Sequence, residues 1–454
     1  MESYDFTEMD DDMVHIKEII DIQRLLLNIS DENYLNTKIS LLSFSIFQSE
    51  DGVQEFLHRI IITMSIKPGL DGLIAPLLAD IVKNYSTQFP FLSLVNEFMF
   101  KAIFHPRNKF SYLDSIDPIV FICSCSKFGL VTELEIVNQV KGFYEQYPTF
   151  PHQIVLFTIL FSPILELHNK EFYSLLLVFA NEYSKDPMFP IELCHGLNEL
   201  NRLKENNWKL FNASISCGSI VDSMEYSIKF DDTELFLKYS SVSNFDFNQS
   251  ILASVFERNS FLQRTPTLLS YAAFFGSIKC FKILVLSGAD PKICDTLGKS
   301  TIHFAAASRD ISFYRFVSQW LDSFDGGPHF SARFYNFDLF EWFYNNNPTI
   351  LSEIHPTFGS VMHQACLSEN FEIVLLCIKH GITPNYVSED GWTPLHVAAQ
   401  NGNYSLMKLF LKNSVDINVQ DTDGVTSNYF EPHYILQLSR AIYPLWHYYY
   451  QLRI

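Results

Sequence analysis

A short segment that recurs at a fixed spacing limits what this chain can fold into. The copy at Gly391–Gly402 has the signals of a short helix followed by a turn. Thr393 suits the N-cap, Pro394 suits the first helical position, and Gly402 suits the left-handed residue that ends a helix. The same framework begins at three earlier places, with 33 residues separating the starting residues within each pair: Thr267 and Ser300, then Ser360 and Thr393. This spacing predicts a stack of similar helix pairs that bury their apolar faces on one another.

The copies share more than their spacing. Each has a capping residue, a histidine or serine three residues later, and then small residues such as Ala398 and Ala399. Turns of the form Asp-x-x-Gly follow at Asp295–Gly298 and Asp421–Gly424, and a Gly-Ala-Asp sequence occupies 288–290. On these motifs residues 267–454 resemble the ankyrin-repeat proteins, whose units of about 33 residues contain Thr-Pro-Leu-His. Individual copies depart from that pattern at Leu268, Thr301, Val361, Ser270, Ser414 and Val415.

The resemblance predicts a series of units with β-hairpin or turn connections. We expect units at 267–299, 300–332, 360–392 and 393–425, and a partial cap at 426–454. The gap from Ser300 to Ser360 is shorter than two periods, so a shortened unit is expected at 333–359, with Ala332 as an inner small residue and Phe337–Tyr344 as its second helix. Residues 213–266 are expected to form a degenerate repeat, with an insertion at 249–266 that packs over the end of the stack.

The N-terminal half has a helical period of apolar residues. After an acidic tail at 1–12, which is either a solvated end or a docking tail, residues 13–212 are expected to form an α-helical domain. Expected helices include Met13–Ile29, Val53–Ser65, His152–Leu167, Lys170–Tyr183 and Ile191–Lys204, with Asp31 as the N-cap of the second helix. The fold class is therefore all-α, with a helical domain followed by an α-solenoid. This layout, with its Phe-, Ile- and Asn-rich sequence, also resembles the large ankyrin families of unicellular eukaryotes.

Composition narrows the function. The formal net charge of −19 argues against general binding of nucleic-acid backbones or anionic membranes, both of which need clustered cations. The acidic N-terminus does not resemble a signal peptide, and the longest apolar runs are well short of the roughly 20 residues that cross a bilayer. Eight scattered cysteines fit a reducing compartment. We expect a soluble protein in the cytoplasm, with the nucleus as the alternative.

The sequence offers no arrangement typical of an enzyme or a metal centre. It lacks the common phosphate-binding, hydrolase and zinc-protease motifs, and Cys123, Cys125, Cys194 and His195 do not have zinc-ligand spacing. His303, His363 and His396 recur at one repeat position, where such a histidine bonds neighbouring backbone and ties adjacent units. Asp231 and Asp232 are expected to cap a helix. We therefore expect no catalytic residue, no cofactor and no bound metal.

The resemblance implies that the repeats bind another protein through a concave groove. Trp392 lies between the turn glycine and Thr393, where it either contacts a partner or packs on the adjacent hairpin. Further candidates on the hairpin tips are Tyr386, Lys292, Lys299 and Asp423. Tyr271 and Phe274 are candidates on the face of the first helices, as is Phe275 unless it belongs to the core. The protein is expected to act as an adaptor or scaffold; the alternative is a structural role in which the N-terminal half self-assembles.

The C-terminal residues Ala441–Ile454 are strongly apolar and aromatic. One possibility is that they fold back and bury Leu445, Trp446 and Leu452 on the unit that begins at Thr393. The other is that they leave an aromatic patch exposed for a partner or for self-association. We favour the first, because Leu436, Leu438 and Ile442 give a helix face that the open end of the stack would cover. Deleting residues 440–454 separates them, because only the fold-back arrangement predicts a loss of stability.

Overall fold

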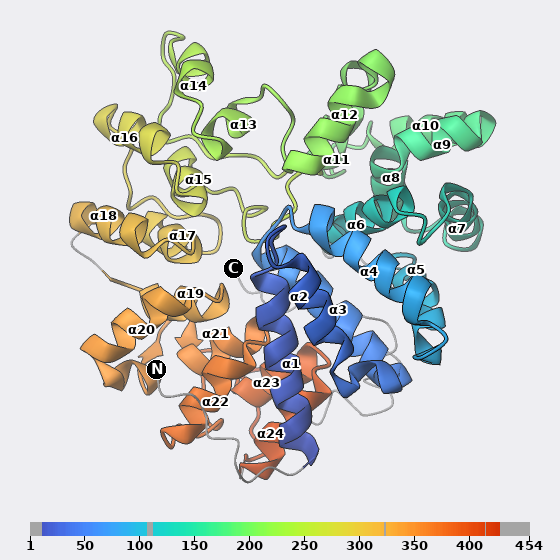
Figure 1. The fold of residues 1–454 in the computed structure, drawn as a ribbon. Helices are drawn as coiled ribbons and strands as arrows, with labels where there is room; N and C mark the ends of the chain where they lie inside the picture. Colours follow the sequence, from blue (N-terminus) through green and yellow to red (C-terminus); the bar gives the residue numbers. More distant parts are fainter. Residues whose placement is uncertain (1–10, 107–111, 322–323, 414, 427–454) are drawn as a thin grey trace.

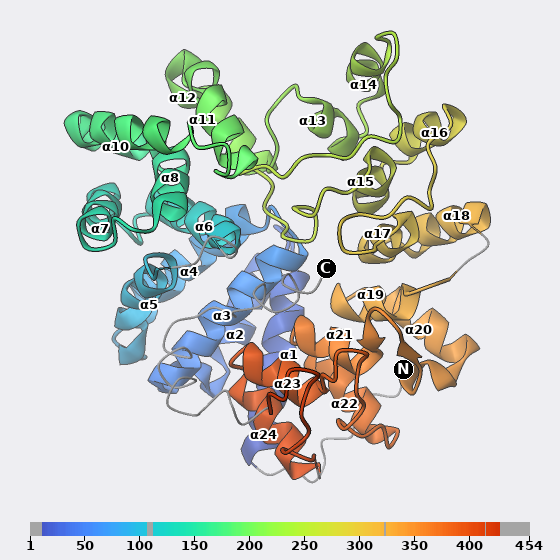
Figure 2. The same ribbon diagram turned by 180° about the vertical axis from the view of Figure 1, so that it is seen from behind.

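The computed structural model describes residues 11–106, 112–321, 324–413 and 415–426. The predicted tail at 1–12 lies outside this range except for its last two residues, and the C-terminal cap lies outside it except for residue 426. Consequently the aromatic C-terminal segment stays a prediction. The described residues form an all-α fold, as predicted, in which the helices follow a nearly closed circuit and α24 returns to lie beside α1 (Figures 1 and 2).

The N-terminal part consists of twelve helices. They are α1 (Asp11–Leu27), α2 (Tyr34–Leu42), α3 (Glu50–Ile66), α4 (Asp71–Tyr85), α5 (Val95–Ile103), α6 (Ile116–Lys127), α7 (Glu133–Gln146), α8 (Pro151–Leu160), α9 (Ser162–His168), α10 (Lys170–Tyr183), α11 (Ile191–Leu203) and α12 (Glu205–Cys217), with 3-10 turns η1 (Ser45–Gln48), η2 (Pro90–Leu94) and η3 (Tyr112–Ser115).

Two expectations for this part were wrong in detail. The helix expected at His152–Leu167 is broken between α8 and α9, because Pro163 has no amide hydrogen for the helical ladder and its ring opposes continuation. Asp31 does not cap α2. It lies in the turn before the helix, and Asn33 occupies the N-cap position.

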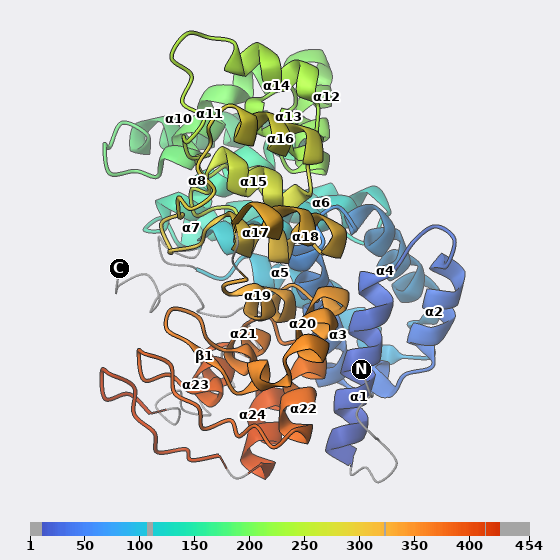
Figure 3. The ribbon, with the colours of Figure 1, turned by 90° about the vertical axis from the view of Figure 1, so that its left-hand side faces the viewer.

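The described residues of the repeat part form six helix pairs stacked in order. The pairs are α13 (Met224–Lys229) with α14 (Thr233–Ser240), α15 (Leu268–Phe275) with α16 (Ile278–Leu286), α17 (Thr301–Ala307) with α18 (Ile311–Leu321), α19 (Gly327–Arg333) with α20 (Phe337–Asn346), α21 (Val361–Leu367) with α22 (Phe371–Lys379), and α23 (Pro394–Gln400) with α24 (Tyr404–Lys412). Figure 3 shows the second helices descending in one column from α14 to α24.

Short hairpins and turns join the pairs. The 3-10 turn η4 (Pro348–Leu351) leads into the antiparallel strands β1 (Ile354–His355) and β2 (Gly359–Ser360). As predicted from the motif, the hydroxyl of Thr393 accepts a hydrogen bond from the amide of His396 (3.3 Å) and so caps α23. On α24, Leu406, Leu409 and Phe410 are buried, whereas Leu411 is exposed.

The shortened unit lacks the hairpin that precedes the first helix elsewhere. Its helix α19 begins at Gly327, six residues before the expected boundary at residue 333, so Ala332 lies inside α19 and is fully buried. Gly326 has a φ of 62°, which favours glycine, and a Cβ on Gly327 would lie 2.5 Å from the ring of Phe343. Because both positions are glycine, α19 can begin in close contact with the neighbouring side chains.

The helix α1 belongs to both hydrophobic cores of the molecule. Its residues Ile22 and Leu26 are buried in the core of the N-terminal helices, whereas Ile16, Ile19 and Ile20 are buried in the core of the repeats. The N-terminal part is thus packed along the repeats. The sequence had indicated only that it precedes the repeats in the chain, and had not predicted this contact.

The insertion at 249–266 does not pack over the end of the stack as expected. Its Phe261 lies among the first helices of three successive units, with ring centroids 4.7 Å from Phe304, 5.5 Å from Phe330 and 6.0 Å from Phe274. Burial of this large aromatic side chain among apolar neighbours explains the placement. We call residues 249–266 the inner segment.

Candidate functional site

Two of the three recurring histidines, His363 and His396, have the structural role that the sequence predicts. The amide of Ser360 donates to Nδ1 of His363 (3.0 Å), so the proton is on Nε2, which donates to the carbonyl of Trp392 in the next unit (2.9 Å). His396 repeats the arrangement with Thr393 (3.1 Å) and Val425 (3.3 Å). Burial lowers the pKa of His363 to about 4, which keeps the ring neutral at pH 7.

His303 makes only the first of these two hydrogen bonds. Its Nδ1 accepts from the amide of Ser300 (2.9 Å), but its Nε2 makes no hydrogen bond within the described residues and lies 3.9 Å from Asp325. The missing bond follows from the missing hairpin before α19, because that hairpin supplies the carbonyl elsewhere. Burial lowers the pKa of His303 to about 4.

A second set of ties between units uses asparagine and was not foreseen. Asn370 caps α22 by accepting from the amide of Ile373 (3.3 Å), and its amide group donates to the carbonyl of Ala332 one unit earlier (2.8 Å). Asn336 does the same with the carbonyl of Ala306 (3.2 Å). Both asparagines directly precede the second helix of their unit, and this shared position was a signal in the sequence.

Much of the concave face is covered by the chain itself. The inner segment lies over α15 and α17, so Tyr271 and Phe274 are buried instead of lining an open groove. The hydroxyl of Tyr271 donates to the carboxylate of Glu257 in the inner segment (2.9 Å). Phe275, beyond the end of this cover, is only half-buried.

Helices α1 and α3 pack on the later units, against α22 and the loop that precedes it. Arg59 of α3 is completely buried and forms an ion pair with Glu369, which follows α21, and His58 bonds the other oxygen of that carboxylate (2.8 Å). Burial would raise the pKa of Glu369, but the neighbouring His58 and Arg59 lower it to about 2. On α1, Arg24 donates two hydrogen bonds to Glu372 (2.6 and 3.1 Å).

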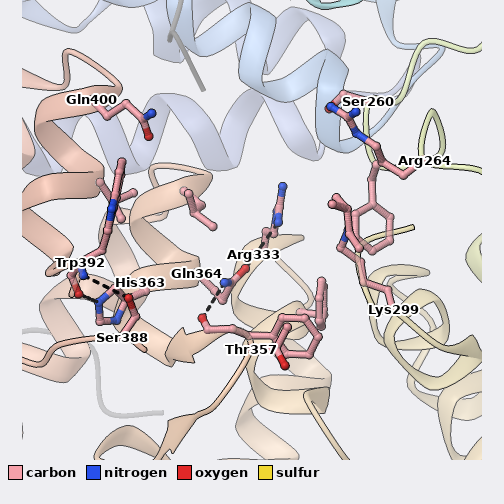
Figure 4. Close-up of a pocket in the computed structure, with 16 residues that line it drawn as sticks. Ser260, Arg264, Lys299, Arg333, Thr357, His363, Gln364, Ser388, Trp392 and Gln400 are labelled. Carbon is pink, nitrogen blue, oxygen red and sulfur yellow. Dashed lines mark hydrogen bonds between the residues drawn. The ribbon is translucent and has the colours of Figure 1, made fainter. Parts of the chain in front are cut away.

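A pocket of about 110 Å³ remains between the hairpins and the first helices. Figure 4 shows side chains converging on it from the inner segment (Arg264), from α19 (Arg333), from α21 (Gln364) and from the last complete hairpin (Trp392). Trp392 is 8% exposed, and its carbonyl is the acceptor for His363. Both roles considered for Trp392 are thus compatible with its place, since it packs in the repeat core and forms one wall of the pocket.

Of the other candidates on the hairpins, only Lys299 reaches this pocket. It is buried, with its Nζ 3.5 Å from Asp295 and 5.0 Å from the ring centroid of Phe261. Tyr386 is half-buried, and Lys292 and Asp423 are exposed; none of the three lines the pocket. The sequence therefore indicated two pocket residues, Trp392 and Lys299, and missed Arg264, Arg333 and Gln364.

The described residues contain no group of His, Cys, Asp and Glu side chains placed to hold a metal ion. All eight cysteines are free. No described helix combines the length and the hydropathy needed to cross a membrane.

Comparison with known proteins agrees with this geometry. A family model described as ankyrin repeats in three copies matches residues 329–421. The chain contains ankyrin repeats. The matched ankyrin region contains the shortened unit and the two units after it, which include the pocket wall formed by Arg333, Gln364 and Trp392.

Several ankyrin relatives match part of the chain. Protein phosphatase 1 regulatory subunit 27 of Homo sapiens is 34% identical over 85 residues, which are 18% of this chain and 55% of that protein. The Mus musculus protein of the same name is 35% identical over 74 residues, which are 16% of this chain and 48% of that protein. Putative ankyrin repeat protein FPV031 of fowlpox virus is 29% identical over 94 residues, which are 20% of this chain and 28% of that protein. The chain thus spans about half the length of the two regulatory subunits.

Among solved structures, the ankyrin repeat domain of human ASB11 aligns with 48% of this chain and 96% of its own, with a TM-score of 0.31 and 16% identity.

Proposed function

We propose that this ankyrin-repeat protein binds another protein through the pocket between its hairpins and first helices, and that it acts without catalysis as an adaptor or scaffold. The observation that supports the proposal most directly is that pocket, which combines apolar walls with a few polar side chains on a concave surface. Two relatives are named as regulatory subunits, a role that is exercised within a complex.

The covered part of the face restricts where a partner can bind. The inner segment occupies the surface of the earlier units, so the proposed contact is limited to the pocket and the hairpin tips around it. Of the residues expected to meet a partner, we retain Trp392 and Lys299 at the pocket and Tyr386, Lys292 and Asp423 on the tips. Tyr271 and Phe274 are retained only as support for the inner segment, because both are buried.

Capture of partners on the full-length chain, followed by mass spectrometry, tests the proposal. Thr357 is exposed at the rim of the pocket, so Thr357→Arg places a long side chain across its mouth without altering the core. Thr87→Arg is the matched control, since Thr87 is exposed in the loop after α4. We expect Thr357→Arg to lose partners that Thr87→Arg keeps. Equal capture by both variants would show that the pocket is not the binding site.

A second candidate function is self-assembly through the N-terminal helices. It is favoured by three exposed apolar side chains near one another in the sequence, Leu167 at 74% exposure, Leu175 at 49% and Val178 at 64%. Sedimentation of the full chain tests it. Concentration-dependent association that is removed by Val178→Glu supports self-assembly, whereas a monomer at all concentrations eliminates it.

A further inference from the structure

The pocket in the repeat groove has a charge opposite to that of the molecule. Its described lining residues include three cations, Arg264, Lys299 and Arg333, and no carboxylate. The chain as a whole has 51 acidic and 32 basic residues. Because most of the protein repels anions, a local group of cations without lining carboxylates is an attractive site for one.

The cations are held in place by their neighbours. Lys299 Nζ lies 5.0 Å and Arg333 Cζ 5.7 Å from the centroid of the Phe261 ring, so both pack on one aromatic side chain of the inner segment. The Thr296 hydroxyl donates to the Arg264 carbonyl (3.1 Å) and so holds the backbone at Arg264. The charged groups of Lys299 and Arg333 are therefore organised before any ligand arrives, which reduces the entropy lost on binding.

Carboxylates outside the pocket lining compensate part of this charge, since Asp295 raises the pKa of Lys299 and Asp114, Asp295 and Glu192 oppose the lowering of the Arg264 pKa by burial. Burial lowers the pKa of Lys299 to about 7, and the charges of Arg333 and Arg264 act in the same direction, while Asp295 opposes them. Nη1 of Arg333 donates to the neutral side-chain oxygen of Gln364 over a long distance of 3.5 Å.

The lining of the pocket also suits an apolar group. Trp392, Phe358 and Leu367 line it, together with the side-chain amides of Gln364 and Gln400. A volume of about 110 Å³ suits one or two side chains. Nucleic acid fits poorly, because its backbone needs cations spread along a surface and the chain has a net charge of −19.

We infer that the pocket binds an acidic peptide segment of a partner protein, with an Asp or Glu side chain at Arg264, Lys299 and Arg333 and an adjacent apolar side chain against Trp392. This inference rests on the proposed function and specifies the chemistry of its partner.

Selection from a displayed library of random short peptides on the full-length chain tests the inference without a known partner. We expect the selected peptides to be enriched in Asp or Glu next to an aromatic or aliphatic residue. A synthetic copy of a selected peptide should bind at least about tenfold more weakly to Arg264→Glu, because truncating or reversing one charge of a desolvated pair is costly. Arg264→Lys is the conservative control and should keep most of the affinity. The melting temperature of each variant shows whether it folds.

The pH dependence of the peptide affinity gives a second test. Lys299 is charged below its pKa of about 7 and neutral above it. Affinity for an acidic peptide should therefore fall as the pH rises through 7, and Lys299→Met should remove this pH dependence while leaving the peptide weakly bound.

Four outcomes would overturn the inference. Selected peptides that are neutral or basic, yet blocked by Thr357→Arg, would leave the proposed function intact and refute the acidic partner. Absence of any binding peptide, together with partner capture unaffected by Thr357→Arg, would refute both. Peptide binding only after truncation at residue 426 would identify the chain's own C-terminal segment as the occupant. Displacement of the peptide by an oligonucleotide of scrambled sequence would identify a phosphate-backbone site.

Discussion

Arg59, on the third helix of the chain, is paired in the interior of the protein with Glu369, which lies 310 residues further along. Neither side chain is more than 3% exposed, and each has one further partner: Nε of Arg59 lies 2.7 Å from Glu55, and His58 bonds Glu369 (2.8 Å). The pair joins α3 to the loop between α21 and α22 and holds the N-terminal helices against the repeats.

We predict that Glu369→Gln destabilises the protein by about 3–5 kcal/mol, because it removes one of the two carboxylates that pair with the buried guanidinium of Arg59 and leaves Glu55 alone to neutralise it. The matched control is Glu372→Gln, which removes the carboxylate bound by the half-exposed Arg24 and should cost about 1 kcal/mol or less. Denaturant unfolding of both variants measures the difference. Similar free energies of unfolding would show that burial of the Arg59 pair adds nothing.

Acid should destabilise the repeats through their histidines. The pKa of His363 is lowered to about 4 in the folded protein and is near 6.5 when exposed, so its stabilising contribution is complete above pH 6.5 and is lost as the pH falls towards 4. At pH 5 the expected loss is roughly 2 kcal/mol for this residue. His363→Gln should be less stable at pH 7 and less sensitive to pH between 7 and 5. An unfolding free energy that is constant over this range would contradict the prediction.

Ala398→Arg should destabilise the last units by several kcal/mol, since Ala398 is completely buried in α23 and a long charged side chain has no space there. Leu411→Arg on α24 is the control and should change the stability by about 0.5 kcal/mol or less, because Leu411 is 55% exposed. Thermal unfolding of the full-length variants distinguishes the two.

Trp392→Ala should reduce both stability and partner binding, because Trp392 belongs to the repeat core as well as to the pocket. The expected cost in stability is about 3–5 kcal/mol, with binding weaker by roughly 2 kcal/mol. Trp392→Phe separates the effects, since it keeps most of the packing and narrows one wall of the pocket. Unchanged affinity in a folded Trp392→Phe variant would remove Trp392 from the binding site.

The sequence predicted the parts of this fold that depend on neighbouring residues. Periodic apolar residues gave the helices of the N-terminal half, including α10 at Lys170–Tyr183, and the 33-residue spacing gave the repeats. The histidine ties followed from the motif because each one joins units that are adjacent in the chain.

The sequence did not predict contacts between distant parts. Arg59 and Glu369 have no pattern that relates them, and Phe261 reads as an ordinary apolar residue of an irregular segment. For the same reason the pocket was seen only in part. Trp392 and Lys299 were visible from the hairpin positions, whereas Arg264 enters the site through the path of the inner segment.

The membership of α1 in both cores has a consequence for the order in which the protein can be made. A linear repeat array can fold unit by unit as it leaves the ribosome, because each unit needs only its neighbour. Here Ile16, Ile19 and Ile20 are synthesised first, but the core that buries them includes residues of α22. These apolar side chains therefore remain exposed until most of the repeats have been synthesised. Such distant pairing is slow and favours aggregation, and nascent chains of this protein should depend on chaperones until the last units emerge.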